Sequence, residues 1–272
     1  MFQHHFLQIL EKYSISRVDN RMSRPNSFRP KLPFMTDQEF EDEAALLLAE
    51  FGRKHGQVAG PPIPIDEIVE LYLEIELELL DMNALFGVDD VHGALWVNER
   101  RIGIDQRFDP QANPKMLGRY HFTLAHEAGH WRLHRKLFQR KANQPTLLPE
   151  STSRPEYICR SSDRDPIEIQ ADKFAASLMM PKEFIKRTWH ELRGAIEPIY
   201  LDALKNDAAF VAASGMERRL HFKSGPNAED DALLECIAQP MADRFEVSAP
   251  AMRNRLESMK LLIRKRERTL FD

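Results

Sequence analysis

The sequence has few cysteines and no long apolar run. Cys159 and Cys236 are the only cysteines among 272 residues, and they do not form a CxxC pair. This excludes a disulfide framework and argues against a thiolate metal site, so we expect any metal to be held by histidine and carboxylate groups. No apolar stretch approaches the roughly 18 residues that a membrane-spanning helix needs. The sequence therefore predicts a protein without a membrane segment.

An excess of charge is absent as well. The formal net charge is −4, so the overall balance gives no reason to expect nucleic acid or an anionic membrane as partner. The first residues, MFQHHFLQIL, lack a basic segment followed by a long apolar stretch, which makes them a poor signal peptide. We expect a cytoplasmic protein.

The N-terminal half predicts two helices followed by a small sheet. Residues 1–34 include a basic stretch rich in proline and serine and predict a flexible segment. Thr36 and Glu39 form a capping-box pattern at the start of the first helix. Apolar periodicity and alternation then predict helices at 36–55 and 65–73 and strands at 73–79, 93–97 and 101–105, arranged as an antiparallel sheet.

Helices dominate the rest of the chain. Asn113 and Pro114 predict the start of a long helix that continues to about residue 138. The polar segment 139–163 is expected to be a loop, and another helix extends from residue 165 to Pro181. We expect one domain at 35–190 and a helical C-terminal region at 191–272.

A metal-binding pattern lies on the long helix. His126 and His130 are four residues apart, so their imidazoles stack on one helix face and can reach the same zinc ion. Glu127 flanks this face, where its carboxylate can take a proton from water. The competing interpretation is a pair of histidines that form hydrogen bonds inside a core.

The next helix offers a third ligand. Glu168 and Asp172 share one face of it, so Glu168 can bind zinc while Asp172 accepts the remaining ring N–H of a ligand histidine. Each has a simpler interpretation: Glu168 completes a capping box with Asp165, and Asp172 lies on a solvated face. Both residues follow the pattern His126-Glu127-x-x-His130, the HExxH motif, and this position favours the metal interpretation.

Taken together, the two motifs resemble the ImmA/IrrE family of metallo-endopeptidases. The resemblance rests on His126-Glu-Ala-Gly-His130-Trp-Arg-Leu-His134 and Glu168-x-x-Ala-Asp172-x-Phe-Ala-Ala-Ser-Leu-Met-Met-Pro181, and covers about residues 36–190. It implies an α+β, zincin-like domain whose sheet packs on the HExxH helix. It also implies one zinc ion per chain, held by His126, His130 and Glu168, with Glu127 as the catalytic base. For His134, a packing or supporting role is favoured.

Peptide hydrolysis needs two further parts. One is a donor for the oxyanion, and Tyr120 and His121 lie near the start of the helix without either being assigned. The other is an edge strand that a substrate extends by strand addition, for which 93–97 and 101–105 are candidates. Trp96 is expected to pack in the core.

The C-terminal stretch 241–260 is helix-turn-helix-like, with Ser248 capping its second helix. Arg253, Arg255, Lys260 and the run 264–268 add positive charge, as a DNA-reading face would require. A helical pair packed on the rest of the protein is favoured over DNA binding, because the whole chain is slightly acidic.

Three functions remain open from the sequence. The first is an endopeptidase, for which the resemblance suggests a DNA-binding transcriptional repressor as substrate. The second is a non-catalytic regulator with a structural zinc site that binds DNA or a partner protein. The third is a toxin–antitoxin or phage-associated module that acts by binding. Glu127 argues against the second, since a structural site needs no base.

Overall fold

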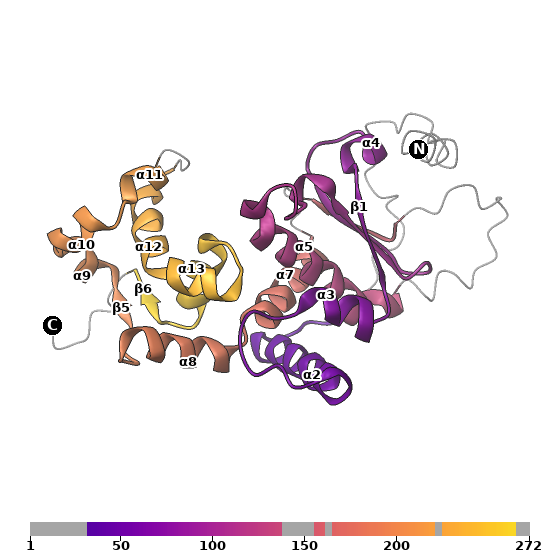
Figure 1. Cartoon of the computed structure of the whole chain (residues 1–272), viewed down its shortest axis with the longest axis horizontal. Coiled ribbons are helices and arrows are strands. Elements are labelled where there is room, and N and C mark those ends of the chain that lie inside the picture. The colour runs from indigo at the N-terminus through magenta and orange to yellow at the C-terminus, as the bar shows by residue number, and fades with distance from the viewer. Residues whose placement is uncertain (1–31, 138–154, 161–164, 221–224, 265–272) are drawn as a thin grey trace. The chain divides into compact units, whose positions relative to one another are not determined.

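The computed structural model describes residues 32–137, 155–160, 165–220 and 225–264 (Figure 1). Most of the predicted flexible segment, residues 1–31, lies outside these ranges. The chain divides into two compact units, one formed by the residues up to Phe40 with Ile65–Ala175, the other by Glu41–Pro64 with Ala176–Asp272. The predicted domain boundaries at 35 and 190 stay predictions.

The first unit contains a mixed sheet. Its strands are β1 (Glu76–Leu80), β2 (Val91–Trp96), β3 (Arg101–Asp105) and β4 (Tyr157–Arg160), in the order β1-β3-β2-β4. The helices that belong wholly to this unit are α3 (Ile65–Glu67), α4 (Met82–Phe86) and α5 (Leu117–Gly129). Short helical turns of other types occupy Ile68–Tyr72, Gln106–Phe108, Pro114–Met116 and His130–His134. Helices α2 (Asp37–His55) and α7 (Pro166–Met179) each contribute residues to both units.

The predicted class of fold is confirmed, with one correction to the sheet. β2 pairs antiparallel with β3 and with β4, whereas β1 pairs parallel with β3. The reason is the order of the strands: α4 reverses the chain after β1, so β2 runs opposite to β1. β3 then lies between them and has the direction of β1. The sheet is therefore mixed, not wholly antiparallel.

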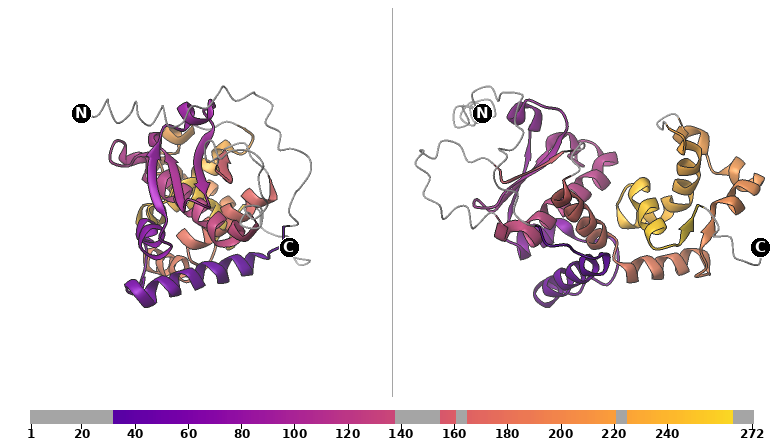
Figure 2. Two further views of the ribbon diagram at one scale, coloured as in Figure 1. Left: turned by 90° about the vertical axis from the view of Figure 1, so that its right-hand side faces the viewer. Right: turned by 180° about the vertical axis from the view of Figure 1, so that it is seen from behind.

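Both faces of the sheet are covered. Helix α5 contacts β2 and β3 on one face, as the views in Figure 2 also show. On the other face, Met82 of α4 packs with Ala94 and Trp96 of β2, and Ile158 of β4 joins this apolar cluster. Trp96 is thus a core residue, as expected. Because side chains alternate along a strand, Tyr157 and Cys159 of β4 point to the α5 face.

The second unit is mainly helical. Its remaining elements are α8 (Lys182–Arg193), β5 (Ile199–Tyr200), α9 (Leu201–Asn206), α10 (Ala208–Ala213), α11 (Met216–Leu220), α12 (Ala228–Phe245), α13 (Ala249–Ser258) and β6 (Leu262–Ile263). β5 and β6 form a parallel pair. The helical C-terminal region predicted from the sequence is therefore present.

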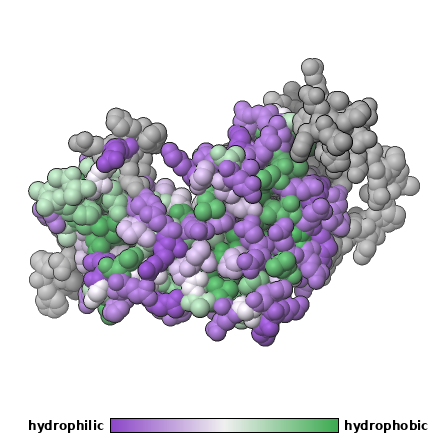
Figure 3. All heavy atoms as spheres, in the orientation of Figure 1, coloured by the Kyte–Doolittle hydropathy of each residue, from purple (hydrophilic) through white to green (hydrophobic). Residues whose placement is uncertain are grey.

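The surface has no dominant apolar face in the view of Figure 3, where hydrophilic side chains cover much of the described surface. Large exposed apolar side chains such as Phe34, Leu71 and Ile196 lie far apart in the sequence. Among the described residues, no helix is long and apolar enough to cross a membrane.

Candidate metal centre

The HExxH motif begins on α5 and ends in a wider turn. Asn113 caps the preceding helical turn through a hydrogen bond that its Oδ1 accepts from the backbone N–H of Lys115, as the sequence predicted. His126 lies in the last turn of α5, and His130 begins the π-helical turn that follows. Such turns are frequent at functional sites because they reposition side chains. The Nε2 atoms of His126 and His130 lie 3.0 Å apart.

Glu168 reaches the same point from the first turn of α7. Its Oε2 lies 3.1 Å from Nε2 of His126 and 3.3 Å from Nε2 of His130. Donors bound to one tetrahedral zinc at about 2.0–2.1 Å lie about 3.3–3.4 Å from each other. The three side-chain atoms therefore have close to the spacing that such an ion requires, and their two imidazoles and one carboxylate suit zinc.

The side chain of Glu168 does not serve as a helix cap. The capping-box alternative requires it to accept a hydrogen bond from the backbone at Asp165. Instead, Oδ1 of Asp165 accepts from the backbone N–H of Ile167, and the carboxylate of Glu168 points to the histidines. A glycine makes this approach feasible, because a Cβ at Gly129 would lie 3.2 Å from the carbonyl oxygen of Ala171 on α7.

Glu127 is fully buried, and neither of its carboxylate oxygens has a hydrogen-bond partner within the described part of the chain. Burial raises its pKa to about 8, an effect that the positive charge of His126 opposes. The carboxylate lies against Gly93 of β2, where an added Cβ would come within 2.7 Å of Oε1. A buried carboxylate without a partner is costly, and the raised pKa of Glu127 reflects that cost.

Two sets of side chains orient the histidines. Oδ1 of Asp172 lies 2.8 Å from Nδ1 of His126. In the neutral ring, a hydrogen bond donated by Nδ1 to this carboxylate leaves Nε2 unprotonated and able to bind a metal. This is the contact that the sequence suggested for Asp172.

The second set was not predicted beyond a supporting role for His134. Nδ1 of His130 lies 3.1 Å from Nδ1 of His134, whose Nε2 lies 3.0 Å from Oε1 of Gln170. The amide of Gln170 is itself fixed, because its Nε2 donates to the carbonyl oxygen of Pro33 at 2.8 Å. His134 must then donate to Gln170 and accept from His130, which leaves Nε2 of His130 unprotonated.

Electrostatics agree with this arrangement. Burial lowers the pKa of His130 to about 4, so its imidazole is neutral at pH 7. Burial also acts on Glu168, but the ring nitrogens of His126 and His130 beside it outweigh burial and hold the pKa of this carboxyl far below its usual range. A neutral imidazole and an ionised carboxylate are the forms that bind a metal.

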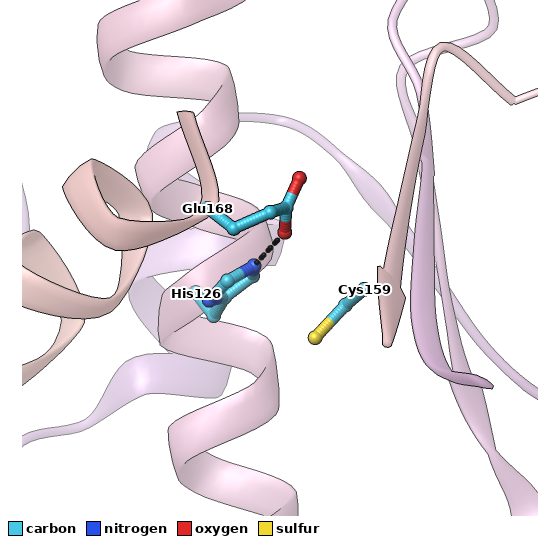
Figure 4. A group of neighbouring side chains, drawn as sticks. All are labelled: His126, Cys159 and Glu168. Atoms are coloured by element: carbon cyan, nitrogen blue, oxygen red, sulfur yellow. Dashed lines mark hydrogen bonds and ion pairs between the residues drawn. The ribbon is translucent and has the colours of Figure 1, made fainter. Parts of the chain in front are cut away.

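Sequence reasoning missed β4 and its cysteine. The segment 139–163 was expected to be a loop, yet Tyr157–Arg160 pairs with β2, with Cys159 opposite Gly93. Figure 4 shows the thiol of Cys159 pointing from β4 toward His126 and Glu168. Sγ and one donor atom from each of these two residues lie within 4.8 Å of one another. The sequence argument against a thiolate site, based on the lack of a CxxC pair, did not anticipate a thiol beside these residues, and it stays a prediction.

The prediction of the edge strand that a substrate would extend also needs correction. β2 and β3 each have neighbours on both sides, so neither is an edge strand; the edges of the sheet are β1 and β4. The oxyanion donor stays unassigned. The hydroxyl of Tyr120 donates to Asp66 at 2.5 Å, and Nε2 of His121 lies 3.7 Å from the same carboxylate.

In the second unit, α12 and α13 form the helix-turn-helix-like pair. Ser248 caps α13 by accepting a hydrogen bond from the backbone N–H of Ala251, as predicted. The arginines expected to give this segment a basic face form ion pairs. Arg253 contacts Asp231, Glu235 and Glu257, and Arg255 contacts Glu41. These contacts neutralise much of the charge that DNA binding would use.

The fold and this centre define a class of protein. A helix with HExxH against a small sheet, joined by a carboxylate from a following helix, is the arrangement of a zincin-like metallopeptidase domain. The comparison with known families agrees, because a peptidase family described as the IrrE N-terminal-like domain matches residues 86–212. This match supports the ImmA/IrrE family that the two motifs predicted. Comparison with curated proteins and with solved structures gives no significant match.

Proposed function

We propose that the chain is an endopeptidase that binds one zinc ion through His126, His130 and Glu168. One observation carries the proposal: three donor atoms converge at 3.0–3.3 Å beside a buried carboxylate that has no partner among the described residues. The family match supports a metallopeptidase-type function, and a peptidase acts on a protein or peptide substrate. We assign the peptidase domain to residues 35–190 and the helical C-terminal region to 191–272.

Each polar side chain then has a defined task. Bound zinc would lower the pKa of water and polarise the scissile carbonyl group. Glu127 takes a proton from the attacking water onto a carboxylate oxygen and gives it to the leaving amine nitrogen. Asp172 and His134 keep the Nε2 atoms of the ligand histidines unprotonated. The closely packed glycines 93 and 129 allow the carboxylates to approach.

The substrate backbone is expected to extend an edge of the sheet. β4 is the better candidate of the two edge strands, because its Cys159 faces the ligands. Along β4, the described residues pair with β2 on one side only. An extended substrate on the other side would pass the centre.

The proposed target is a DNA-binding transcriptional repressor. This follows from the family resemblance, which links such peptidases to the control of transcription. The alternative is a non-catalytic zinc-containing regulator that acts on DNA or a partner. The burial of Glu127 disfavours it, since an unpaired buried carboxylate lowers stability and serves no purpose in a structural site.

The first test is the zinc content of three purified proteins: wild type, Glu127→Gln and Glu168→Ala. We expect about one zinc per chain in wild type and Glu127→Gln, and loss of most of the metal in Glu168→Ala, which lacks a ligand. Equal zinc in Glu168→Ala and wild type would contradict the ligand set.

The second test concerns hydrolysis and uses the zinc-loaded proteins. Wild type and Glu127→Gln are each incubated with an extract of cells that carry the gene, and newly formed protein N-termini are sequenced. Termini formed only with wild type identify the substrate. If both proteins produce the same termini, or if neither produces any while both hold zinc, the result favours the non-catalytic alternative over the endopeptidase.

A further inference from the structure

A second donor group lies beside the three proposed ligands. Cys159 is on β4, which is fixed to the α5 side by the ring of Tyr157: this ring stacks on His130 with centroids 4.2 Å apart. The hydroxyl of Tyr157 also donates to the carbonyl oxygen of His134 at 3.3 Å. These contacts hold β4, the strand that carries Cys159, against the histidine turn.

The thiol points inward to the metal-binding atoms. Sγ, one ring nitrogen of His126 and a carboxylate oxygen of Glu168 lie within 4.8 Å of one another (Figure 4). A sulfur at about 2.3 Å from a tetrahedral zinc lies about 3.6 Å from the nitrogen and oxygen ligands. A small displacement, of the size that a change of side-chain rotamer supplies, bridges this difference.

Several carboxylate oxygens near the thiol have unused hydrogen-bonding capacity. Oε1 of Glu168 and both carboxylate oxygens of Glu127 are buried without a hydrogen-bond partner among the described residues. Glu127 lies against Gly93, the residue paired with Cys159 across the sheet. Acceptors with unused capacity thus surround the same point from α5 and α7, and a cation there would satisfy them together.

We propose that Cys159 is the fourth protein ligand of the metal and holds the centre closed until a substrate or thiol reagent displaces it. This inference depends on the proposed function, because it requires a metal at His126, His130 and Glu168. Binding converts the S–H group into a thiolate: the S–H bond breaks, a sulfur–metal bond forms, and the proton passes to solvent.

The fourth ligand has a functional consequence. A zinc centre with four protein ligands is of the structural type, whereas catalysis needs one position for water. With Cys159 bound, Glu127 has no water to deprotonate, and the peptidase is latent. A thiolate also favours zinc over manganese or magnesium, which prefer oxygen ligands.

The test uses Co²⁺ as a spectroscopic substitute for zinc in the full chain. Wild type, Cys159→Ser and Cys236→Ser are stripped with a chelator, titrated with Co²⁺ and followed by absorption. Cys236 is the matched control, because its thiol donates to the carbonyl oxygen of Ser214, outside the centre. We expect one Co²⁺ per chain and a sulfur-to-cobalt charge-transfer band in wild type and Cys236→Ser. Cys159→Ser should lose the band and bind at least about tenfold more weakly.

The outcomes separate the two proposals. One Co²⁺ per chain without the band in wild type overturns the thiolate ligand and leaves the proposed zinc centre intact. Failure of wild type to bind Co²⁺ or zinc overturns both. A band that survives Cys159→Ser overturns the assignment to this cysteine.

Alkylation supplies an independent measurement. In wild type, modification of Cys159 by iodoacetamide is followed by peptide mass spectrometry with and without bound zinc. We expect zinc to slow modification of Cys159 at least about tenfold and to leave Cys236 unaffected. Equal rates at Cys159 with and without zinc would contradict a sulfur–metal bond.

Discussion

The charged side chains of the candidate metal centre and those around α13 differ in whether the protein supplies their hydrogen-bond partners. At the metal centre, the buried carboxylate of Glu127 lacks a partner among the described residues. In the second unit, Arg255 donates to both carboxylate oxygens of Glu41, at 2.6 and 2.9 Å, and to the carbonyl oxygen of Met180. The first group is incomplete without a ligand, whereas the second is completed by the protein.

The difference helps to separate function from structure. Buried ionisable groups are tolerated when they are paired, and an unpaired group persists where it has a functional task. By this criterion, the residues of α5 and α7 are the stronger candidate for a binding site. The arginines around α13 are structural, which favours a packed helical pair over a DNA-reading face.

The largest expected effect tests the unpaired carboxylate in the metal-free protein. The pKa of Glu127 is about 8 in the folded chain and near 4.5 in the unfolded chain. The folded state therefore keeps a proton that the unfolded state loses, and this stabilisation disappears as the pH rises from 4.5 to 8. Compared with Glu127→Gln, which stays neutral, wild type should lose about 4 kcal/mol between pH 5 and pH 9.

The measurement is urea unfolding of both proteins in a chelator across this pH range. The wild-type and variant curves should converge at pH 5 and separate at pH 9, with the variant more stable. Parallel curves would show that Glu127 is not buried in the folded protein.

In the second unit, we expect a substitution at a buried ion pair to lower the free energy of unfolding. Arg255→Leu leaves the carboxylate of Glu41 buried without its main partner, and we expect a loss of about 3 kcal/mol in the free energy of unfolding. The control is Arg244→Leu, which removes an ion pair with Glu191 whose side chains are 44% and 47% exposed. This change should cost less than about 1 kcal/mol. Similar losses in the two variants would remove the distinction between buried and exposed pairs.

Local patterns explain which parts of this comparison the sequence predicted. Thr36 and Glu39 form the capping box expected from their spacing, with the Thr36 backbone N–H donating to Glu39 and the Glu39 backbone N–H donating to Thr36. The hairpin of β2 and β3 and the HExxH helix likewise depend on neighbours in the sequence. The spacing of His126 and His130 on one helix was enough to predict that their rings meet.

The missed features depend on contacts between distant segments. Whether Tyr157–Arg160 forms a strand is decided by its pairing with β2, more than sixty residues earlier in the chain. The same pairing brings Cys159 opposite Gly93. The insertion of β3 between β1 and β2 is also a property of the assembled sheet, and no periodicity in a single segment indicates it.

A smaller effect tests the orientation of His126. Asp172→Asn keeps the shape of the side chain but removes the negative charge that fixes the ring N–H. We expect zinc affinity to fall about tenfold, the low end for such contacts, because the Asp172 side chain is 60% exposed. Competition with a chelator of known zinc affinity measures it. Lys173→Met, at the neighbouring exposed ion pair with Asp37, is the control and should bind as wild type does.

The smallest effect tests the longer chain of contacts through His134. Gln170→Leu removes the acceptor for Nε2 of His134, so this ring is free to adopt the other tautomer and to donate toward His130. His130 would then carry its proton on Nε2 in part of the molecules, and zinc would have to displace it. We expect the zinc affinity to fall about threefold at pH 7, which corresponds to about 0.6–0.7 kcal/mol. Zinc binding should also release more protons than in wild type, and calorimetry in buffers of different ionisation enthalpy measures this release. Gln170→Glu is the matched variant that keeps an acceptor and should restore the affinity. If Gln170→Leu and Gln170→Glu bind zinc equally, the orientation of His130 is set by the stacked ring of Tyr157 and not by this chain of hydrogen bonds.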